Sequence, residues 1–324
     1  MLVIGAQQVR DALDYGSLVD GLERRHREAP PRVDRLLMEQ PTESGDPDFF
    51  LIWQAWQPGR ALGSKLATGF PRNAAEGKGL PTVQAVYLLF DGRDGRPWAM
   101  IDGTELTYWK TAADSALGAR YLARSDAGSL LMVGAGAMAP HLVRAHRAVR
   151  PSIERVTIWN RSAAKAEHLA EALRGEGLAA RATGDLKTAA AQADVICCAT
   201  ASRAPLIEGA WLRPGAHLDL VGGFTNAMRE ADDAAARRAR IFVDSRWFTI
   251  GQCGDITGPL ESGAITEADV LGDLFELCQG KVEGRRGAEE ITFFKNAGGA
   301  HLDLMTAELI VARVSPKPSD SVSS

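Results

Sequence analysis

The chain has 324 residues, of which 45% are hydrophobic, 24% charged and 6% aromatic, a composition typical of a globular protein long enough for two domains. It carries 37 Lys and Arg residues against 41 acidic ones, a net charge of −4, which disfavours a nucleic-acid partner. No apolar run is long enough to span a membrane and no signal-like start is present, so we expect no membrane partner and a cytoplasmic location. The four cysteines form no CxxC pair, so we expect no metal site.

The first hundred residues contain four apolar runs separated by turns rich in Gly, Pro and Asp. These runs predict strands over 49–53, 61–67, 82–90 and 97–101. The last two are joined by a short turn that resembles a hairpin connection. The pattern predicts a mostly antiparallel sheet. Apolar residues at helical spacing over 107–124 then predict a helix that leads into the next part of the chain.

From residue 128 onward, apolar runs alternate with helical stretches, the pattern of a parallel sheet with crossover helices. The predicted strands cover 129–133, 155–159, 194–198, 217–221 and 240–244. Five such strands make up most of a Rossmann-type doubly wound sheet. The fold class is therefore α/β, a Rossmann-type parallel sheet joined to a second, mostly antiparallel α+β domain.

A glycine-rich turn follows the first strand of the predicted parallel sheet. Gly134 permits the tight turn, Gly136 lets the backbone approach a pyrophosphate, and Ala139 allows the next helix to pack on the strand. Ala137 and Met138 complete the turn at the helix N-terminus, which favours an anion. A glycine turn between strand and helix can also be purely structural. Its position after a strand and before a helix favours dinucleotide binding.

The end of the second strand indicates which dinucleotide binds. An acidic residue there would bind the ribose 2′-hydroxyl of NAD, but the chain continues with Asn160, Arg161 and Ser162. Arg161 can pair with a 2′-phosphate, and the other two can donate hydrogen bonds to it. The alternative is a solvated turn with Ser162 as a helix N-cap. The sequence favours NADPH, with NADH possible.

Basic residues of the N-terminal region are candidates for substrate binding. Arg32 follows two prolines and has the planar guanidinium that clamps a carboxylate. Lys65 stands within an apolar strand, where a lysine either reaches solvent or has a function. Lys110 and Thr111 open an alanine-rich helix, where they bind an anion or lie in its exposed first turn.

Taken in chain order, these segments resemble the ornithine cyclodeaminase and mu-crystallin family over nearly the whole chain. The resemblance implies a homodimer, each subunit pairing a Rossmann domain over 114–290 with a discontinuous substrate-binding and dimerisation domain over 1–113 and 291–324. The motifs that carry it are Pro-x-Arg32, Gly63-Ser-Lys65, Phe70-Pro-Arg-Asn73, Leu80-Pro-Thr82, Lys110-Thr-Ala-Ala, Val133-Gly-Ala-Gly136, Val221-Gly-Gly-Phe-Thr225, Val243-Asp-Ser-Arg246 and Phe294-Lys-Asn-Ala-Gly298 with Asp303.

The resemblance also implies roles for single residues. Arg32 would hold the substrate carboxylate, with Lys110 as a second anion-binding group. Lys65 would contact the substrate near its reacting nitrogen or carboxylate. The cofactor contacts implied beyond the glycine turn and 160–162 are Thr82, Thr111, Thr200, Val221, Gly223 and Asn296, with Thr82 and Asn296 beside the nicotinamide.

Two positions depart from the family pattern. Ornithine cyclodeaminases have an aspartate after the glycine pair at 222–223, where this chain has Phe224, so a base for ornithine oxidation is missing. The segment instead resembles the branch that reduces cyclic ketimines. Most of the family has arginine where this chain has Lys110. Lysine keeps the positive charge but cannot bind a carboxylate in the bidentate manner of arginine.

The resemblance therefore implies an NADPH-dependent reductase that converts Δ1-pyrroline-2-carboxylate or Δ1-piperideine-2-carboxylate to L-proline or L-pipecolate. Lys65 is the candidate catalytic proton donor, a role that requires a pKa lowered by burial and by neighbouring cations. The alternatives are an ornithine cyclodeaminase, an alanine or other amino acid dehydrogenase, and a non-catalytic NADPH-dependent binding protein like mu-crystallin.

Overall fold

The computed structural model describes residues 1–43, 47–75 and 80–315, which form two compact units. The first unit contains residues 1–25, 29–110 and the segment from 299 onward. The second contains residues 26–28 and 111–298. The boundary predicted after residue 113 lies later in the chain than the one observed after residue 110. The boundary predicted after residue 290 lies earlier than the one observed after residue 298. Within the described residues, no helix is both long and apolar enough to cross a membrane.

The first unit is built on a six-stranded sheet in the order β1-β6-β5-β4-β3-β2. Strand β1 runs parallel to β6, and every other pair is antiparallel. Strands β3 to β6 confirm the four predicted runs. Strands β1 and β2 were not predicted, since β2 is an edge strand whose exposed residues lack a buried alternating face. The strands are β1 (Leu2–Ile4), β2 (Arg32–Gln40), β3 (Asp48–Gln57), β4 (Ala61–Gly69), β5 (Val83–Asp91) and β6 (Pro97–Asp102).

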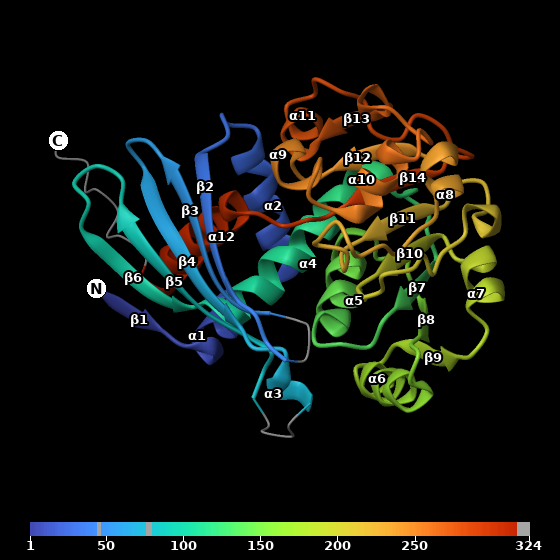
Figure 1. The fold of residues 1–324 in the computed structure, drawn as a ribbon, viewed down its shortest axis with the longest axis horizontal. Helices are drawn as coiled ribbons and strands as arrows, with labels where there is room; N and C mark the ends of the chain where they lie inside the picture. Colours follow the sequence, from blue (N-terminus) through green and yellow to red (C-terminus); the bar gives the residue numbers. More distant parts are fainter. Residues whose placement is uncertain (44–46, 76–79, 316–324) are drawn as a thin grey trace, which may run out of the picture. The chain divides into compact units, whose positions relative to one another are not determined.

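One long helix packs against this sheet. Helix α12 (Ala300–Val314) lies against β3, β4 and β5 (Figure 1). Residues of β4 alternate between buried and half-buried, and the buried set includes Lys65. The remaining helices of the unit are α1 (Ala6–Ala12), α2 (Tyr15–His26), α3 (Arg72–Ala75) and the first part of α4 (Gly103–Leu122).

Helix α4 begins four residues before the predicted start at Thr107. The side chain of Asp102 accepts a hydrogen bond from the backbone N–H of Glu105 (2.8 Å), which caps the helix at this earlier point. Lys110 and Thr111 therefore lie in the middle of the helix, and the prediction that they open it was wrong. Lys110 is also only 2% exposed, whereas its neighbours 107–109 and 111 are half-buried, so its side chain lies on the buried side of the helix.

The second unit contains an eight-stranded parallel sheet in the order β13-β12-β14-β11-β10-β7-β8-β9. The five predicted strands are confirmed as β7, β8, β10, β11 and β12. Strands β9, β13 and β14 were missed, since none of them contains more than two adjacent apolar residues. The strands are β7 (Ser129–Val133), β8 (Arg155–Trp159), β9 (Ala179–Thr183), β10 (Val195–Cys198), β11 (His217–Leu220), β12 (Arg240–Val243), β13 (Val270–Asp273) and β14 (Thr292–Lys295).

The strand order contains a switch point between β7 and β10. From β7 the chain adds β8 and β9 on one side and then crosses to add β10 and β11 on the other. Ligands of doubly wound sheets bind beyond the carboxyl ends of the strands at such a point. The helices of the unit, drawn in Figure 1, are the rest of α4 with α5 (Met138–Val149), α6 (Ala163–Gly175), α7 (Leu186–Gln192), α8 (Asp233–Arg238), α9 (Arg246–Thr249), α10 (Gly254–Glu261) and α11 (Leu274–Cys278).

Candidate active site

The glycine-rich turn joins β7 to α5 at the switch point. Gly134 has a φ of 110°, and a Cβ there would lie 2.6 Å from the carbonyl oxygen of Ala199, so only glycine fits. A Cβ at Gly136 would meet nothing within 4 Å. Helix α5 starts at Met138, and the preceding Ala137 provides no side-chain cap. The open space and the uncapped backbone N–H groups suit a pyrophosphate.

In the segment after β8, Asn160 is half-buried and Arg161 and Ser162 are exposed. Asn160 donates a hydrogen bond from Nδ2 to the carbonyl of Ser162 (3.0 Å). Ser162 occupies the N-cap position of α6, but its hydroxyl makes no capping hydrogen bond. Arg161 is exposed and forms no ion pair within the described residues. The guanidinium and the hydroxyl are thus both available to an anionic ligand.

Asn296 directly follows β14 and is buried. Its Nδ2 donates hydrogen bonds to the carbonyl of Thr111 (2.9 Å) and to Oγ of Ser115 (3.0 Å). A carbonyl oxygen can only accept hydrogen bonds, so the group that faces Thr111 must be the NH2 of the Asn296 side chain. This fixes the orientation of the amide. Oδ1 of Asn296 is therefore a buried acceptor without a partner among the described residues. Such an orphaned acceptor at the carboxyl edge of the sheet fits an amide donor of a ligand.

Asn296 is linked through Ser115 to a series of buried hydrogen bonds. Ser115 Oγ donates to Oδ1 of Asp219 (3.0 Å), whose Oδ2 contacts His146 Nε2 (2.9 Å) and Cys197 Sγ (3.1 Å). Burial raises the pKa of the Cys197 thiol well above its usual value, which keeps the thiol protonated as a donor. No local pattern predicts this set of hydrogen bonds, because its members come from α4, α5, β10 and β11.

Two loops follow the neighbouring strands β10 and β11 and contain further predicted cofactor contacts. Thr200 follows β10, and its backbone N–H and hydroxyl both bind the buried carboxylate of Glu230. Val221 and Gly223 follow β11, and Val221 donates its N–H to the carbonyl of Cys198. In the same loop Phe224, which replaces the family aspartate, is 59% exposed.

In the first unit, Lys65 and Lys110 meet at one carboxylate. Lys65 Nζ lies 2.9 Å from Oδ2 of Asp303, and Lys110 Nζ lies 3.7 Å from Oδ1. The ring of Trp53 lies beside both ammonium groups, 4.8 and 5.6 Å from its centroid. In the register of the sheet, Lys65 stands between Trp53 and Tyr87. Two cations sharing one anion leave a buried positive charge.

This environment changes the acidity of Lys65. Burial lowers its pKa to about 8, with a further contribution from the charge of Lys110, while the ion pair with Asp303 opposes the change. A lysine with this pKa is mostly protonated at neutral pH and still able to release its proton. The pKa is thus shifted in the direction that a proton-donating Lys65 needs, and the catalytic role stays a prediction.

Two predicted residues of the first unit are not brought to this group. Arg32 is exposed and opposes Trp56 in the sheet, whereas Lys65 opposes Trp53, so alternation puts their side chains on opposite faces. Thr82 lies just before β5, where its carbonyl accepts a hydrogen bond from the N–H of Phe70 (2.7 Å). The roles of Arg32 and Thr82 stay predictions.

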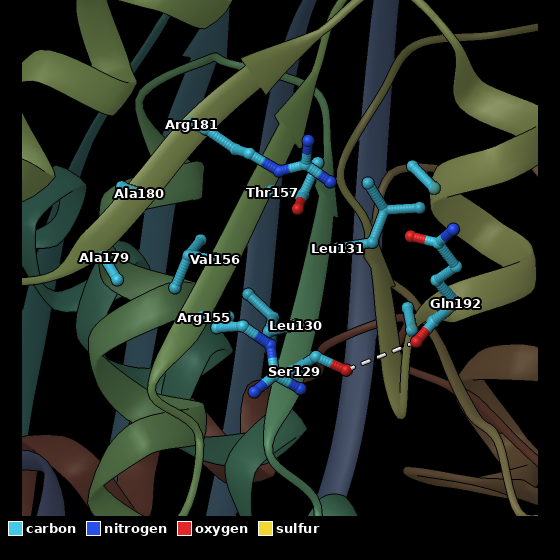
Figure 2. Close-up of a pocket in the computed structure, with 12 residues that line it drawn as sticks. Ser129, Leu130, Leu131, Arg155, Val156, Thr157, Ala179, Ala180, Arg181 and Gln192 are labelled. Atoms are coloured by element: carbon cyan, nitrogen blue, oxygen red, sulfur yellow. Dashed lines mark hydrogen bonds between the residues drawn. The ribbon is translucent and has the colours of Figure 1, made fainter.

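A cavity of about 450 Å³ lies elsewhere, on the face of β7, β8 and β9 beside α7 (Figure 2). Its lining includes Ser129, Arg155 and Ala179, the first residues of their strands. The cavity thus lies toward the amino ends of the strands. Because dinucleotides bind beyond the carboxyl ends, this cavity is separate from the predicted cofactor site.

Comparison with known proteins agrees with this arrangement. The sequence profile of the ornithine cyclodeaminase/mu-crystallin family matches residues 37–317. The chain belongs to this family. A Δ1-pyrroline-2-carboxylate reductase of Paracoccus denitrificans is 47% identical over 302 residues, which cover 93% of each chain.

Two solved structures of relatives cover almost all of the chain. The Δ1-pyrroline-2-carboxylate reductase of Thermococcus litoralis, in complex with NADH and L-proline, has a TM-score of 0.90 and 29% identity, covering 97% of both chains. An archaeal alanine dehydrogenase dimer with bound NAD has a TM-score of 0.88 and 25% identity, covering 97% of this chain and 96% of the other. The family thus includes proteins named for ketimine reduction and for amino acid oxidation.

The sequence analysis assigned no role to Asp303 or Glu230. Asp303 was noted only as part of a family motif, although a carboxylate in an otherwise apolar helical pattern is a signal for a buried cation partner. Glu230 lies in a polar stretch whose sequence gives no sign of burial. Both carboxylates are fully buried in the structure.

Proposed function

We propose that the protein reduces a cyclic ketimine carboxylate, Δ1-pyrroline-2-carboxylate or Δ1-piperideine-2-carboxylate, to L-proline or L-pipecolate. The observation that carries the proposal is the buried positive charge of Lys65 and Lys110, which share the single carboxylate of Asp303. A substrate carboxylate would neutralise that charge. The names of the reductases that this chain resembles support the same substrate class.

Lys65 supplies the proton of the proposed reaction. An imine accepts a hydride at carbon readily only when its nitrogen is protonated, and the ammonium group of Lys65 donates or shares that proton. Its pKa of about 8 keeps this group charged at neutral pH. Lys110 holds the substrate carboxylate, which fixes the orientation of the ring. The hydride and the proton together convert the C=N bond to CH–NH.

The second unit holds the nicotinamide cofactor, which supplies the hydride when bound. The turn at Gly134 and Gly136 would hold the pyrophosphate, and the orphaned Oδ1 of Asn296 would accept a hydrogen bond from the carboxamide. Thr111 fixes the orientation of the Asn296 amide through its carbonyl. The exposed Arg161, with no acidic residue beside it, favours NADPH over NADH.

Replacing Arg161 with alanine should weaken NADPH binding about tenfold and leave NADH binding unchanged, because only NADPH carries the 2′-phosphate that the guanidinium pairs with. Fluorescence titration of each nucleotide measures both dissociation constants. Arg286→Ala, which removes an exposed arginine paired with Glu290, is the matched control. Equal losses of affinity for both nucleotides would show that Arg161 does not bind the 2′-phosphate of NADPH.

The activity itself is tested by NADPH oxidation, and separately NADH oxidation, with each of the two ketimines. Rapid oxidation that depends on a ketimine supports the proposal. Oxidation with pyruvate and ammonia alone would indicate an alanine dehydrogenase, and proline formation from ornithine would indicate a cyclodeaminase. Tight NADPH binding without turnover of any of these substrates would indicate a binding protein.

We also propose a homodimer formed through the six-stranded sheet. The sheet face that points away from Lys65 and α12 carries apolar side chains that are exposed or only half-buried. An extended apolar face of this kind is typical of a protein interface. Edge strand β2 contributes to it. Side chains of this face include Leu36, Met38, Ile52, Leu66, Val86 and Leu88.

Met38→Lys should convert the proposed dimer to a monomer. Met38 is 58% exposed in the single chain, so lysine is tolerated there by the monomer but places a charge in the interface. Sedimentation velocity should show the mass falling by half. Glu39→Lys, on the other face of the same strand, is the control. A monomeric unmodified protein would overturn the proposed dimer.

A cytoplasmic location is proposed from the cysteines. Cys197, Cys198, Cys253 and Cys278 are all buried free thiols. Free buried thiols are typical of a reducing compartment.

A further inference from the structure

Glu230 joins the two loops that follow β10 and β11. Its Oε1 accepts hydrogen bonds from the backbone N–H (2.7 Å) and the hydroxyl (2.8 Å) of Thr200. Its Oε2 accepts one from the backbone N–H of Gly222 (2.7 Å). The side chain is fully buried. One carboxylate thus holds together two loops at the carboxyl edge of adjacent strands, next to the switch point.

The backbone around this carboxylate is packed so closely that it requires glycine. A Cβ at Gly222 would clash with the backbone of Thr200 and would lie 2.6 Å from Oε1 of Glu230. A Cβ at Gly223 would lie 2.6 Å from Oδ2 of Asp255. The paired glycines after β11 therefore allow the loop to close over buried carboxylates. Close packing thus gives a physical reason for the glycine pair of the family motif at 221–225.

Other charged and titratable groups face Glu230 from three elements. Asp255, in the first turn of α10, accepts the backbone N–H of Glu230 (2.7 Å) and pairs with Lys295 of β14 at 3.2 Å. Cys197 and Cys198 of β10 are buried neighbours whose pKa values burial raises well above the usual range, so they stay neutral. Two carboxylates therefore share the single positive charge of Lys295.

We propose that Glu230 is a positioning residue that holds Thr200 and Gly222 in the geometry which binds the nicotinamide cofactor. This rests on the cofactor site proposed above. Three donors converge on the carboxylate, and all three are satisfied only when it is ionised, because protonation adds a fourth hydrogen and removes acceptor capacity. Protonation of Glu230 should release part of the two loops and weaken cofactor binding.

The proposal predicts a pH dependence of binding near neutrality. Burial raises the pKa of Glu230 to about 7; the charge of Asp255 adds to the rise, while Lys295 and the hydrogen bonds from Thr200 oppose it. An acid with a raised pKa is protonated below that pH. Cofactor affinity should therefore be full above pH 8 and fall as the pH drops through 7.

The experiment measures the dissociation constants of NADH and NADPH by fluorescence between pH 5.5 and 9. NADH is needed because the 2′-phosphate of NADPH itself titrates near pH 6. We expect a loss of affinity on the acid side of about pH 7 with both nucleotides. Glu230→Gln should bind both nucleotides about tenfold more weakly at pH 8, because the NH2 group of glutamine faces backbone and hydroxyl donors that need an acceptor. Its affinity for NADH should not fall on the acid side, because the amide does not titrate.

Thr200→Val provides a test that does not remove the carboxylate. It deletes one hydrogen bond that stabilises the ionised form, so the acid limb should move up by about one pH unit. A purely structural role of Thr200 would lower affinity without moving the limb. Circular dichroism would reveal whether Glu230→Gln fails to fold. In that case the position of the acid limb in Thr200→Val tests the proposal by itself. Glu176→Gln, an exposed carboxylate paired with Arg144, is the control and should match the unmodified protein.

An unchanged acid limb in Glu230→Gln, or affinity at pH 8 equal to that of the unmodified protein, would overturn the proposal. The readout is binding, so it stands even if no ketimine is reduced. A protein that binds neither nucleotide would overturn both this inference and the proposed cofactor site. Binding with the expected limb but without ketimine turnover would leave Glu230 in its role and refute only the proposed reaction.

Discussion

Lys65→Met should lower kcat for ketimine reduction about a thousandfold, because it removes the proposed proton donor while keeping a side chain of similar length. The buried ion pair with Asp303 fixes the ammonium group in one position, and Lys110 is the second lysine that shares this carboxylate. NADPH binding should be unchanged, since Lys65 belongs to the first unit. Stopped-flow or steady-state assays give kcat, and fluorescence titration gives the dissociation constant.

The pH profile distinguishes a proton donor from a group that merely binds the substrate. With a pKa of about 8, Lys65 is protonated at neutral pH and loses its proton above it. At saturating cofactor, kcat should therefore be constant below pH 7.5 and fall up to tenfold per pH unit above about 8. Lys65→Arg keeps the charge but cannot release a proton, so it should show low activity without this alkaline limb.

Lys187→Met, which changes an exposed lysine of α7, is the control for the loss of a lysine and should keep full activity. If Lys65→Met retained more than a tenth of kcat, the proton would have to come from elsewhere. Water bound to the substrate nitrogen would then be the first candidate. An alkaline limb that persisted in Lys65→Met would lead to the same conclusion.

The fold could be predicted from the sequence where local patterns decide it. The GxGxxA turn stands between a buried apolar strand and an amphipathic helix, so strand β7, the turn and helix α5 were all placed correctly. The edge strand β2 was missed because its exposure removes the alternation on which strand prediction depends. Strand β14 was missed because it contains only two adjacent apolar residues between Thr292 and Lys295, although it completes the sheet between β11 and β12.

The site could be predicted only where one residue carries the signal. Lys65 was identifiable as a lysine among apolar strand neighbours, and its burial is now explained by Asp303. The partner itself lies 238 positions further along the chain, so no local pattern connects the two. Glu230 has the same difficulty, since its partners Thr200 and Gly222 are brought to it by loops after two different strands. Burial and long-range pairing are properties of the fold, and a single sequence does not show them.

Asp303→Asn should lower kcat at pH 8 by about thirtyfold and restore part of it at pH 6. The charge of Asp303 raises the pKa of Lys65 against the opposing effects of burial and Lys110, so its loss lowers that pKa below 8. Lys65 is then mostly neutral at pH 8 and cannot donate a proton, and acidification returns the proton. The alkaline limb of the pH profile should move to lower pH, which a full kcat–pH curve measures.

Substrate affinity should respond in the opposite direction. Without the charge of Asp303, no carboxylate among the described residues pairs with Lys65 or Lys110, so at pH 6 the substrate carboxylate meets a higher positive charge and KM should fall several-fold. The variant should also be less stable, since removing one partner of a buried pair costs about 3 to 5 kcal/mol, part of which Lys65 recovers by losing its proton.

Glu308→Gln, on the same helix, is the matched control, because Glu308 pairs with Arg25 and Arg60. That control should lose stability without moving the alkaline limb. A limb that stays at pH 8 in Asp303→Asn would mean that the titrating group is not Lys65.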